Sequence, residues 1–127
     1  MAITGVANLA VKVRDLAAAV AFYRRSGARV TDPQEWRNGL RADVHLGPLQ
    51  ITLFTRPLYE DVVELPEEGF LHVALFSDDL DREIDGHAVV WGPDVVRGPT
   101  FGTRRIAFVE APGNMRLEFM EQLEEPK

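Results

Sequence analysis

The sequence contains no cysteine, no long apolar run and no excess of basic residues. Without cysteine there can be no disulfide framework, thiolate metal site or cysteine nucleophile. No apolar stretch approaches the roughly 20 residues of a membrane-spanning helix, so we expect no membrane partner. The net charge of -6 argues against a nucleic-acid partner. The first residues also lack the basic start and apolar core of a signal peptide, so we expect a soluble, cytoplasmic protein.

The most informative feature that the sequence does contain is an internal repeat. Residues 8–16 recur 64 positions later (72 − 8) as residues 72–80, and the apolar positions coincide. Residues 50–54 are echoed in the same way by residues 116–120. A chain built from two copies of one supersecondary unit has to be interpreted as a pair. The repeat aligns Asn8 with His72 and Thr52 with Glu118.

The length of 127 residues and a hydrophobic fraction of 46% suit one globular domain. We predict repeat unit one over residues 3–57, a linker over 58–69 and repeat unit two over 70–122. Each unit is too small to be stable without burying a face on its twin.

Each unit is predicted to contain a strand, a helix and three further strands. In the first unit Asp15 caps a helix over residues 16–26, which Gly27 ends. Asn38-Gly39 and Gly47-Pro48 predict two tight hairpin turns. In the second unit a strand over 70–76 precedes a short helix capped by Asp79, an extended stretch over 89–96 and a hairpin of residues 103–109 and 115–120.

Strand pairing predicts which side chains share a face of the first unit. A two-residue turn at Gly47-Pro48 places Asp43 opposite Thr52, and one at Asn38-Gly39 places Trp36 opposite Arg41. The apolar face, which we expect to pack on the helices, carries Ala42, Val44, Leu46, Leu49, Ile51 and Leu53. The other face either meets solvent or lines a wet cavity; it carries Trp36, Arg41, Asp43, His45, Gln50, Thr52 and Phe54.

Three stretches of the chain resemble the vicinal oxygen chelate superfamily, which includes glyoxalase I, methylmalonyl-CoA epimerase, extradiol dioxygenases and bleomycin-resistance proteins. The stretches are the strand leading into residues 15–23, the restart at residues 72–75 and the closing residues 101–118, in which Ala111 stands where an Asp is usual. The resemblance implies an α+β fold of paired βαβββ units. Their strands would form a curved, cavity-enclosing mixed sheet with helices on the outer face.

The resemblance also implies four metal-ligand positions, matched here by Asn8, Thr52, His72 and Glu118. The usual residues there are His, Glu or Gln, His and Glu, so the second unit keeps its pair and the first has lost it. Catalytic zinc or iron sites normally have three strong protein ligands, whereas Asn and Thr oxygens are weak, neutral donors. We therefore expect no cofactor, with a weakly bound divalent metal as the alternative.

Other side chains are candidate ligand contacts. Trp36, Phe54 and Phe101 could form an aromatic wall, although Phe54 could equally belong to the core. His45 could be a base or simply a polar rim residue. Arg104 and Arg116 could fix an anionic group, or they could pair with Glu110 and Glu121.

Two functions remain open. In the first, the protein sequesters an aromatic or cationic natural product in a largely metal-free cavity. In the second, it is a lyase, isomerase or dioxygenase that uses His72 and Glu118 with a weakly held divalent metal or as an acid/base pair. The fold cannot decide between them. In either case the partners are a small-molecule ligand or substrate and a second copy of the chain, because a small curved sheet leaves edges that need cover.

Overall fold

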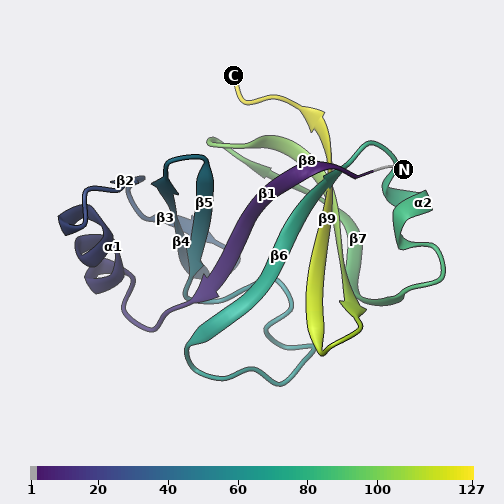
Figure 1. The fold of residues 1–127 in the computed structure, drawn as a ribbon, viewed down its shortest axis with the longest axis horizontal. Helices are drawn as coiled ribbons and strands as arrows, with labels where there is room; N and C mark the ends of the chain where they lie inside the picture. The colour runs from purple at the N-terminus through teal and green to yellow at the C-terminus, as the bar shows by residue number, and fades with distance from the viewer. Residues whose placement is uncertain (1–2) are drawn as a thin grey trace. The chain divides into compact units, whose positions relative to one another are not determined.

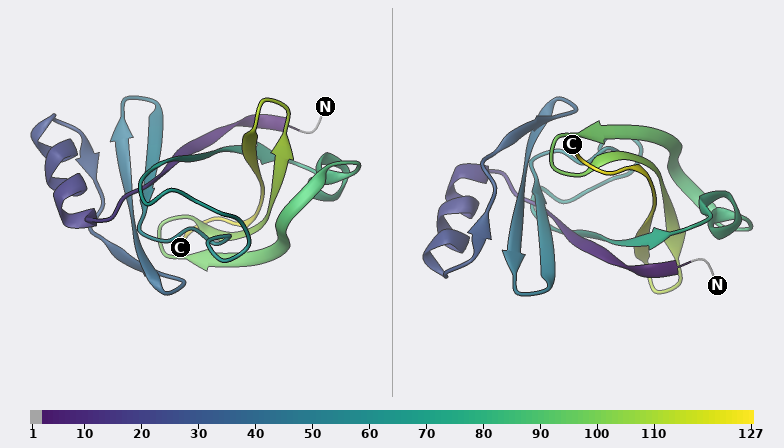
Figure 2. Two further views of the ribbon diagram at one scale, coloured as in Figure 1. Left: turned by 90° about the horizontal axis from the view of Figure 1, so that it is seen from below. Right: turned by 90° about the horizontal axis from the view of Figure 1, so that it is seen from above.

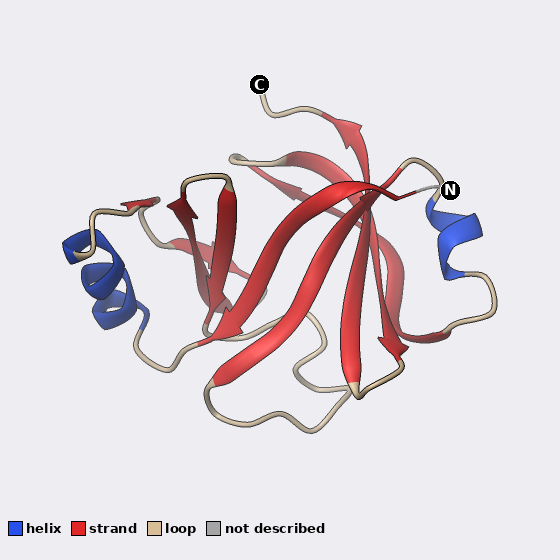
Figure 3. Cartoon of the chain, in the orientation of Figure 1, coloured by secondary structure: helices blue, strands red, loops and turns tan. Residues whose placement is uncertain are grey.

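The computed structural model describes residues 3–127, which form nine strands and two helices (Figures 1 and 3). By internal contacts these residues divide into two compact units. One is Asn8–Leu71; the other comprises residues 3–7 and 72–127, so the first strand contributes to both. Within residues 3–127, neither helix has the length and apolarity required to cross a membrane.

The unit Asn8–Leu71 is built on the second half of β1 (Ile3–Lys12) and four further strands. Helix α1 (Leu16–Arg25) is followed by β2 (Arg29–Val30), β3 (Gln34–Trp36), β4 (Gly39–Leu46) and β5 (Leu49–Phe54). The order across the sheet is β2-β4-β5-β1, and β3 also pairs with β4. Strand β1 runs parallel to β5, whereas β4 and β5 form an antiparallel hairpin.

The apolar face of this unit packs on α1, as the alternation predicted. Leu16 and Val20 of the helix form one buried cluster with Ala42, Val44 and Leu53 of the sheet. Figure 2 shows α1 beside the β4–β5 hairpin from two further directions. The outer members of the predicted apolar face, Leu46 and Leu49, flank the turn and stay exposed.

The predicted helix ends are confirmed. The Asp15 carboxylate accepts a hydrogen bond from the Ala18 amide at 3.0 Å, and Gly27 adopts a φ of 90° just after α1. A left-handed residue at this point is the usual way to end a helix, and glycine adopts it without steric cost. Asp79 caps α2 (Leu80–Ile84) in the same way through the Arg82 amide at 3.2 Å.

One hairpin turn differs from the prediction. The turn residues are Arg37 and Asn38, with φ of 48° and 69°, so Trp36 lies opposite Gly39 and not opposite Arg41. Two positive φ angles are typical of a type I′ turn. Gly39 is needed for close packing instead, because a Cβ there would lie 2.8 Å from the Thr55 hydroxyl. The register shifts by two residues, so Trp36 and Arg41 still share a face.

In the second compact unit the order of elements is the predicted one. Strand β6 (Gly69–Ser77) and α2 precede β7 (Ala88–Gly98), β8 (Gly102–Ala111) and β9 (Met115–Glu124). Strand β9 is parallel to β6 and antiparallel to β8, which is antiparallel to β7. Leu80 of α2 is fully buried in an apolar cluster on one face of these strands, with Ala107, Val109 and Phe119.

The strand registers of the two units are alike. Ala10 lies opposite Thr52 in the β1–β5 pair, and Ala74 lies opposite Glu118 in the β6–β9 pair. Both pairs are parallel, and each unit carries its helix against the apolar face of its sheet. The α+β class with a mixed sheet is thereby confirmed.

The segment expected to be a linker packs against the first unit. Tyr59 is fully buried, and Leu65 packs on the cluster of Ala10, Phe54 and Leu71. Glu67 and Glu68 contact Arg14, the residue that follows the end of β1 by two positions. The segment therefore covers part of the first unit's polar face.

Candidate functional site

The two functional candidates of the second unit lie in direct contact. His72 on β6 and Glu118 on β9 are both buried, and the imidazole Nε2 lies 3.0 Å from the carboxylate Oε1. Parallel pairing sets Ala74 opposite Glu118, so His72 is two residues back on the same face. A buried imidazole and carboxylate satisfy each other and can exchange a proton.

Aromatic side chains surround this pair. The Phe108 ring, directly opposite Glu118 on β8, lies edge-on to His72 with 4.9 Å between ring centroids. Trp91 on β7 extends the contact to Phe108 at 5.9 Å. An apolar ring therefore lies against the imidazole of the pair, and a low local dielectric strengthens an electrostatic interaction.

The buried carboxylate of the first unit belongs to Asp43 on β4, whereas that of the second unit, Glu118, lies on the last strand, β9. Asp43 on β4 is opposite Thr52, and its Oδ1 accepts three hydrogen bonds. The donors are Arg41 Nη2 at 3.0 Å, Thr52 Oγ1 at 3.0 Å and Gln50 Nε2 at 3.2 Å. Thr52 thus uses its hydroxyl hydrogen on Asp43.

Two residues of the predicted aromatic wall, Trp36 and Phe54, lie near each other in the first unit beside the Arg41 cation. Trp36 and Phe54 have centroids 6.5 Å apart. The Arg41 guanidinium lies 4.9 Å from the Trp36 centroid and 5.5 Å from that of Phe54. Arg41 therefore joins the aromatic pair to the Asp43 carboxylate.

The remaining predicted residues of this unit make fewer contacts. Asn8 is buried and its side-chain amide donates only a long, 3.4 Å hydrogen bond to the Leu9 carbonyl. His45 is half-buried and lies two residues from Asp43 on β4, opposite Gln50. Both share the polar face with Thr52.

A second ion pair on this face was not predicted. Lys12, opposite Phe54 in the parallel register, forms a salt bridge with Glu60, and both side chains are largely buried. One signal for it is visible in the sequence: Lys12 interrupts an apolar strand at a position where the repeat has Phe76. Its partner lies in the segment after β5, 48 residues away, which no local pattern predicts.

Phe101 and Arg104 of the second unit contact each other and are both bonded to Gln122. Arg104 Nε donates to Gln122 Oε1 at 2.6 Å, and the guanidinium lies 5.2 Å from the Phe76 centroid and 5.0 Å from that of Phe101. Gln122 in turn donates to the carbonyls of Phe101 and Glu124, each at 2.7 Å. These contacts hold the loop before β8 against the end of β9.

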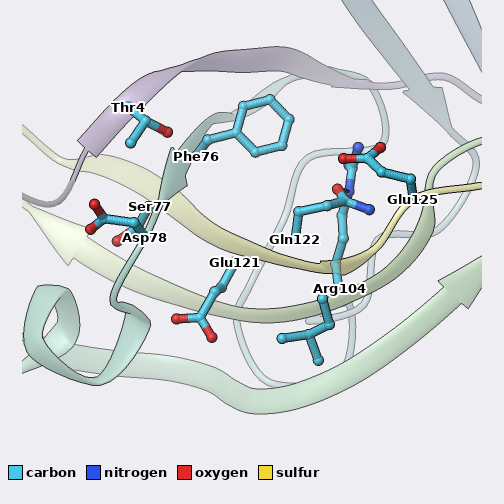
Figure 4. Close-up of a pocket in the computed structure, with 9 residues that line it drawn as sticks. Thr4, Phe76, Ser77, Asp78, Arg104, Glu121, Gln122 and Glu125 are labelled. Atoms are coloured by element: carbon cyan, nitrogen blue, oxygen red, sulfur yellow. Dashed lines mark hydrogen bonds between the residues drawn. The ribbon is translucent and has the colours of Figure 1, made fainter.

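Phe76, Arg104 and Gln122 also border a pocket of about 710 Å³ at one end of this unit (Figure 4). Arg104 and Gln122 lie at one side of it, and Asp78 and Glu121 at the other. Neither His72 nor Glu118 lines this pocket. Arg116 takes the alternative foreseen for it and pairs with Glu110 at 2.9 Å.

The donor set does not fit a tight transition-metal site. Within residues 3–127, no cluster of three or more His, Asp or Glu side chains is arranged to hold a metal ion. His72 and Glu118 supply two strong donors that bond to each other. The matched positions of the first unit supply an amide and a hydroxyl, and the hydroxyl donates to Asp43. A catalytic zinc site normally requires three strong protein ligands.

Solved structures share this fold. Methylmalonyl-CoA epimerase from Mycobacterium tuberculosis superposes with a TM-score of 0.72 at 21% identity, over 96% of this chain and 90% of that one. A variant of the Streptomyces coelicolor epimerase bound to 2-nitronate-propionyl-CoA gives 0.70 at 22% identity, over 96% and 99%. A variant of glyoxalase I from Zea mays gives 0.67 at 18% identity, over 98% of this chain and 46% of that one.

The fold is that of the vicinal oxygen chelate superfamily. Identities of this size establish the fold alone and leave the activity open. No protein-family model and no curated protein matches the chain.

Proposed function

We propose that the protein is a vicinal oxygen chelate protein that binds and sequesters a small organic molecule without a bound metal. The observation that carries the proposal is the hydrogen bonding at the superfamily's metal positions. His72 and Glu118 bond to each other, and Thr52 bonds to Asp43. Polar groups engaged in this way are preorganised to bind an organic ligand.

The first unit supports an aromatic ligand better than a cationic one. Trp36 and Phe54 form an apolar pair of rings, and Arg41 already occupies the place of a cation over both of them. A cationic ligand would have to displace it against the hydrogen bond to Asp43. An aromatic ligand can stack on the guanidinium or replace it on the rings.

The test is recovery of a bound compound. Purified protein is incubated with a panel of aromatic natural products, separated from free compound, and the bound fraction is analysed by mass spectrometry. We expect an aromatic compound at stoichiometric amount and chemically unchanged. Recovery of a converted product would contradict sequestration.

A second candidate function is catalysis by His72 and Glu118 as an acid/base pair. It is favoured by the 3.0 Å contact beside the Phe108 ring, and the structural neighbours named above are enzymes. The distinguishing variant is Glu118→Gln, which keeps the size and one acceptor but removes the base. A binding protein should lose affinity modestly, whereas an enzyme should lose turnover by about 100-fold or more.

We further propose that the chain is a homodimer. Edge strands with apolar side chains are usually covered, and Val89 on the edge strand β7 is 42% exposed. Light scattering should give twice the chain mass of 14.2 kDa. A monomer mass at micromolar concentration would contradict this. Cytoplasmic location stays a prediction, which cell fractionation tests.

A further inference from the structure

We infer that Asp43 Oδ2 accepts a hydrogen bond from the ligand of the first unit. We further infer that this oxygen selects a neutral donor on the ligand, a hydroxyl or an amide N–H. The inference rests on the proposed function and specifies the ligand for it. It follows from an uneven distribution of hydrogen bonds on one buried carboxylate.

The two oxygens of Asp43 differ sharply. Oδ1 accepts from Arg41, Thr52 and Gln50, whereas Oδ2 accepts no hydrogen bond from any of residues 3–127. The side chain is only 8% exposed, yet Oδ2 is not sealed from solvent. A carboxylate oxygen has two lone pairs, and leaving a buried one without a donor is unfavourable. A ligand donor at Oδ2 would remove that cost.

The carboxylate is held in place for this role. The Thr31 hydroxyl accepts a hydrogen bond from the Asp43 amide at 2.8 Å, which fixes the backbone. Three donors on Oδ1 fix the side chain. A ligand therefore meets an acceptor that need not reorganise, which favours binding.

Local charge defines the kind of donor. Arg41 lies 3.0 Å from Asp43 and already balances its negative charge. The charged and titratable groups beside the carboxylate are Arg41 and His45 on β4, while the facing strand β5 contributes the neutral Gln50 and Thr52. A cationic ligand would gain little from a neutralised carboxylate and would be repelled by Arg41. A neutral O–H or N–H donor has no such penalty.

The experiment uses three probes that share a benzene ring: phenol, its methyl ether anisole, and benzylamine, which is a cation at neutral pH. Binding to the full chain is followed by two-dimensional ¹H–¹⁵N NMR. We expect phenol to shift the signals of Asp43, Gln50 and Thr52 and to bind about tenfold more tightly than anisole, the size expected for a hydrogen bond to a charged acceptor. Benzylamine should bind no better than anisole.

The matched variants are Asp43→Asn and Asp32→Asn. The Asn carbonyl can still accept from Arg41, Thr52 and Gln50, but its NH₂ group presents a donor in place of Oδ2. The advantage of phenol over anisole should therefore fall to within about twofold. Asp32→Asn makes the same change at an exposed carboxylate that pairs with Arg24, outside the polar face, and should keep the advantage.

The possible failures are distinguishable. Equal binding of phenol and anisole at this face, or preferred binding of benzylamine, overturns the inference and leaves the proposed function standing. If none of the three probes perturbs this face, both the inference and the proposed aromatic ligand are contradicted. A phenol preference that survives Asp43→Asn places the acceptor elsewhere and overturns the inference.

Discussion

The β1–β5 and β6–β9 strand pairs have the same parallel backbone pairing but carry different polar side chains. In both pairs the parallel register places an alanine opposite a polar residue: Ala10 of β1 lies opposite Thr52 of β5, and Ala74 of β6 lies opposite Glu118 of β9. In the second pair the carboxylate belongs to β9 and bonds to an imidazole. In the first it lies one strand further, at Asp43 on β4.

The comparison shows which features of a repeat are constrained by packing. Phe108 occupies the position of the second unit that corresponds to Asp43. Asp43 lies opposite Thr52, and Phe108 lies opposite Glu118. The apolar alternation that buries one face fixes the register, because a slip by one residue would expose the core. The polar face carries no such constraint, so its side chains can differ between units.

The largest expected effect tests whether the two cores are equivalent. Leu16 and Leu80 are repeat counterparts, are the first residues of α1 and α2, and are 3% and 0% exposed. Leu16→Ala and Leu80→Ala should each lower the free energy of unfolding by about 2–5 kcal/mol, since each leaves a cavity. Urea denaturation measures both. A negligible cost for either would break the equivalence of the two units.

A smaller effect is expected where the units differ. Lys12→Met removes the cation from Glu60 at the position where the second unit has Phe76. We expect a loss of about 1–3 kcal/mol, because Glu60 is left largely buried without its partner. Arg14→Met is the control: its pairs with Glu67 and Glu68 are exposed and should contribute less than about 1 kcal/mol. If Lys12→Met and Arg14→Met lower the free energy of unfolding equally, the buried Lys12–Glu60 pair contributes no more to stability than an exposed ion pair.

The smallest effect concerns the helix caps. Asp15→Ala and Asp79→Ala each remove an acceptor from a helix amide and should cost about 1 kcal/mol. Asp78→Ala replaces the residue next to the Asp79 cap, leaves the capping carboxylate in place and should change the stability very little. Thermal unfolding of the three variants ranks them. A cost for Asp78→Ala equal to that for Asp79→Ala would refute the assignment of the cap.

The sequence was sufficient for features that local patterns determine. The repeat predicted the order of helix and strands in each unit, Asp15 and Asp79 predicted the helix starts, and Gly47-Pro48 predicted the β4–β5 turn. The other turn was misplaced by one residue because glycine was assumed to supply its positive φ. Arg37 and Asn38 adopt those angles instead, and Gly39 serves close packing.

The sequence was not sufficient for features that depend on distant contacts. Glu60 returns to Lys12 across 48 positions, and Leu65 packs on Phe54 and Ala10 from a segment predicted as a linker. Asp43 was predicted to face the polar side, but strand alternation cannot say that one of its oxygens takes three donors and the other none. Those facts depend on side-chain geometry.

We propose that hydrogen bonding at the positions matched to metal ligands stands in place of a metal. The most direct test of this proposal is elemental analysis of protein purified without chelators from cells supplied with zinc, iron, nickel and manganese. We expect metal far below one ion per chain, with the same result for His72→Ala. About one ion per chain of any of these metals, lost in His72→Ala, would contradict it.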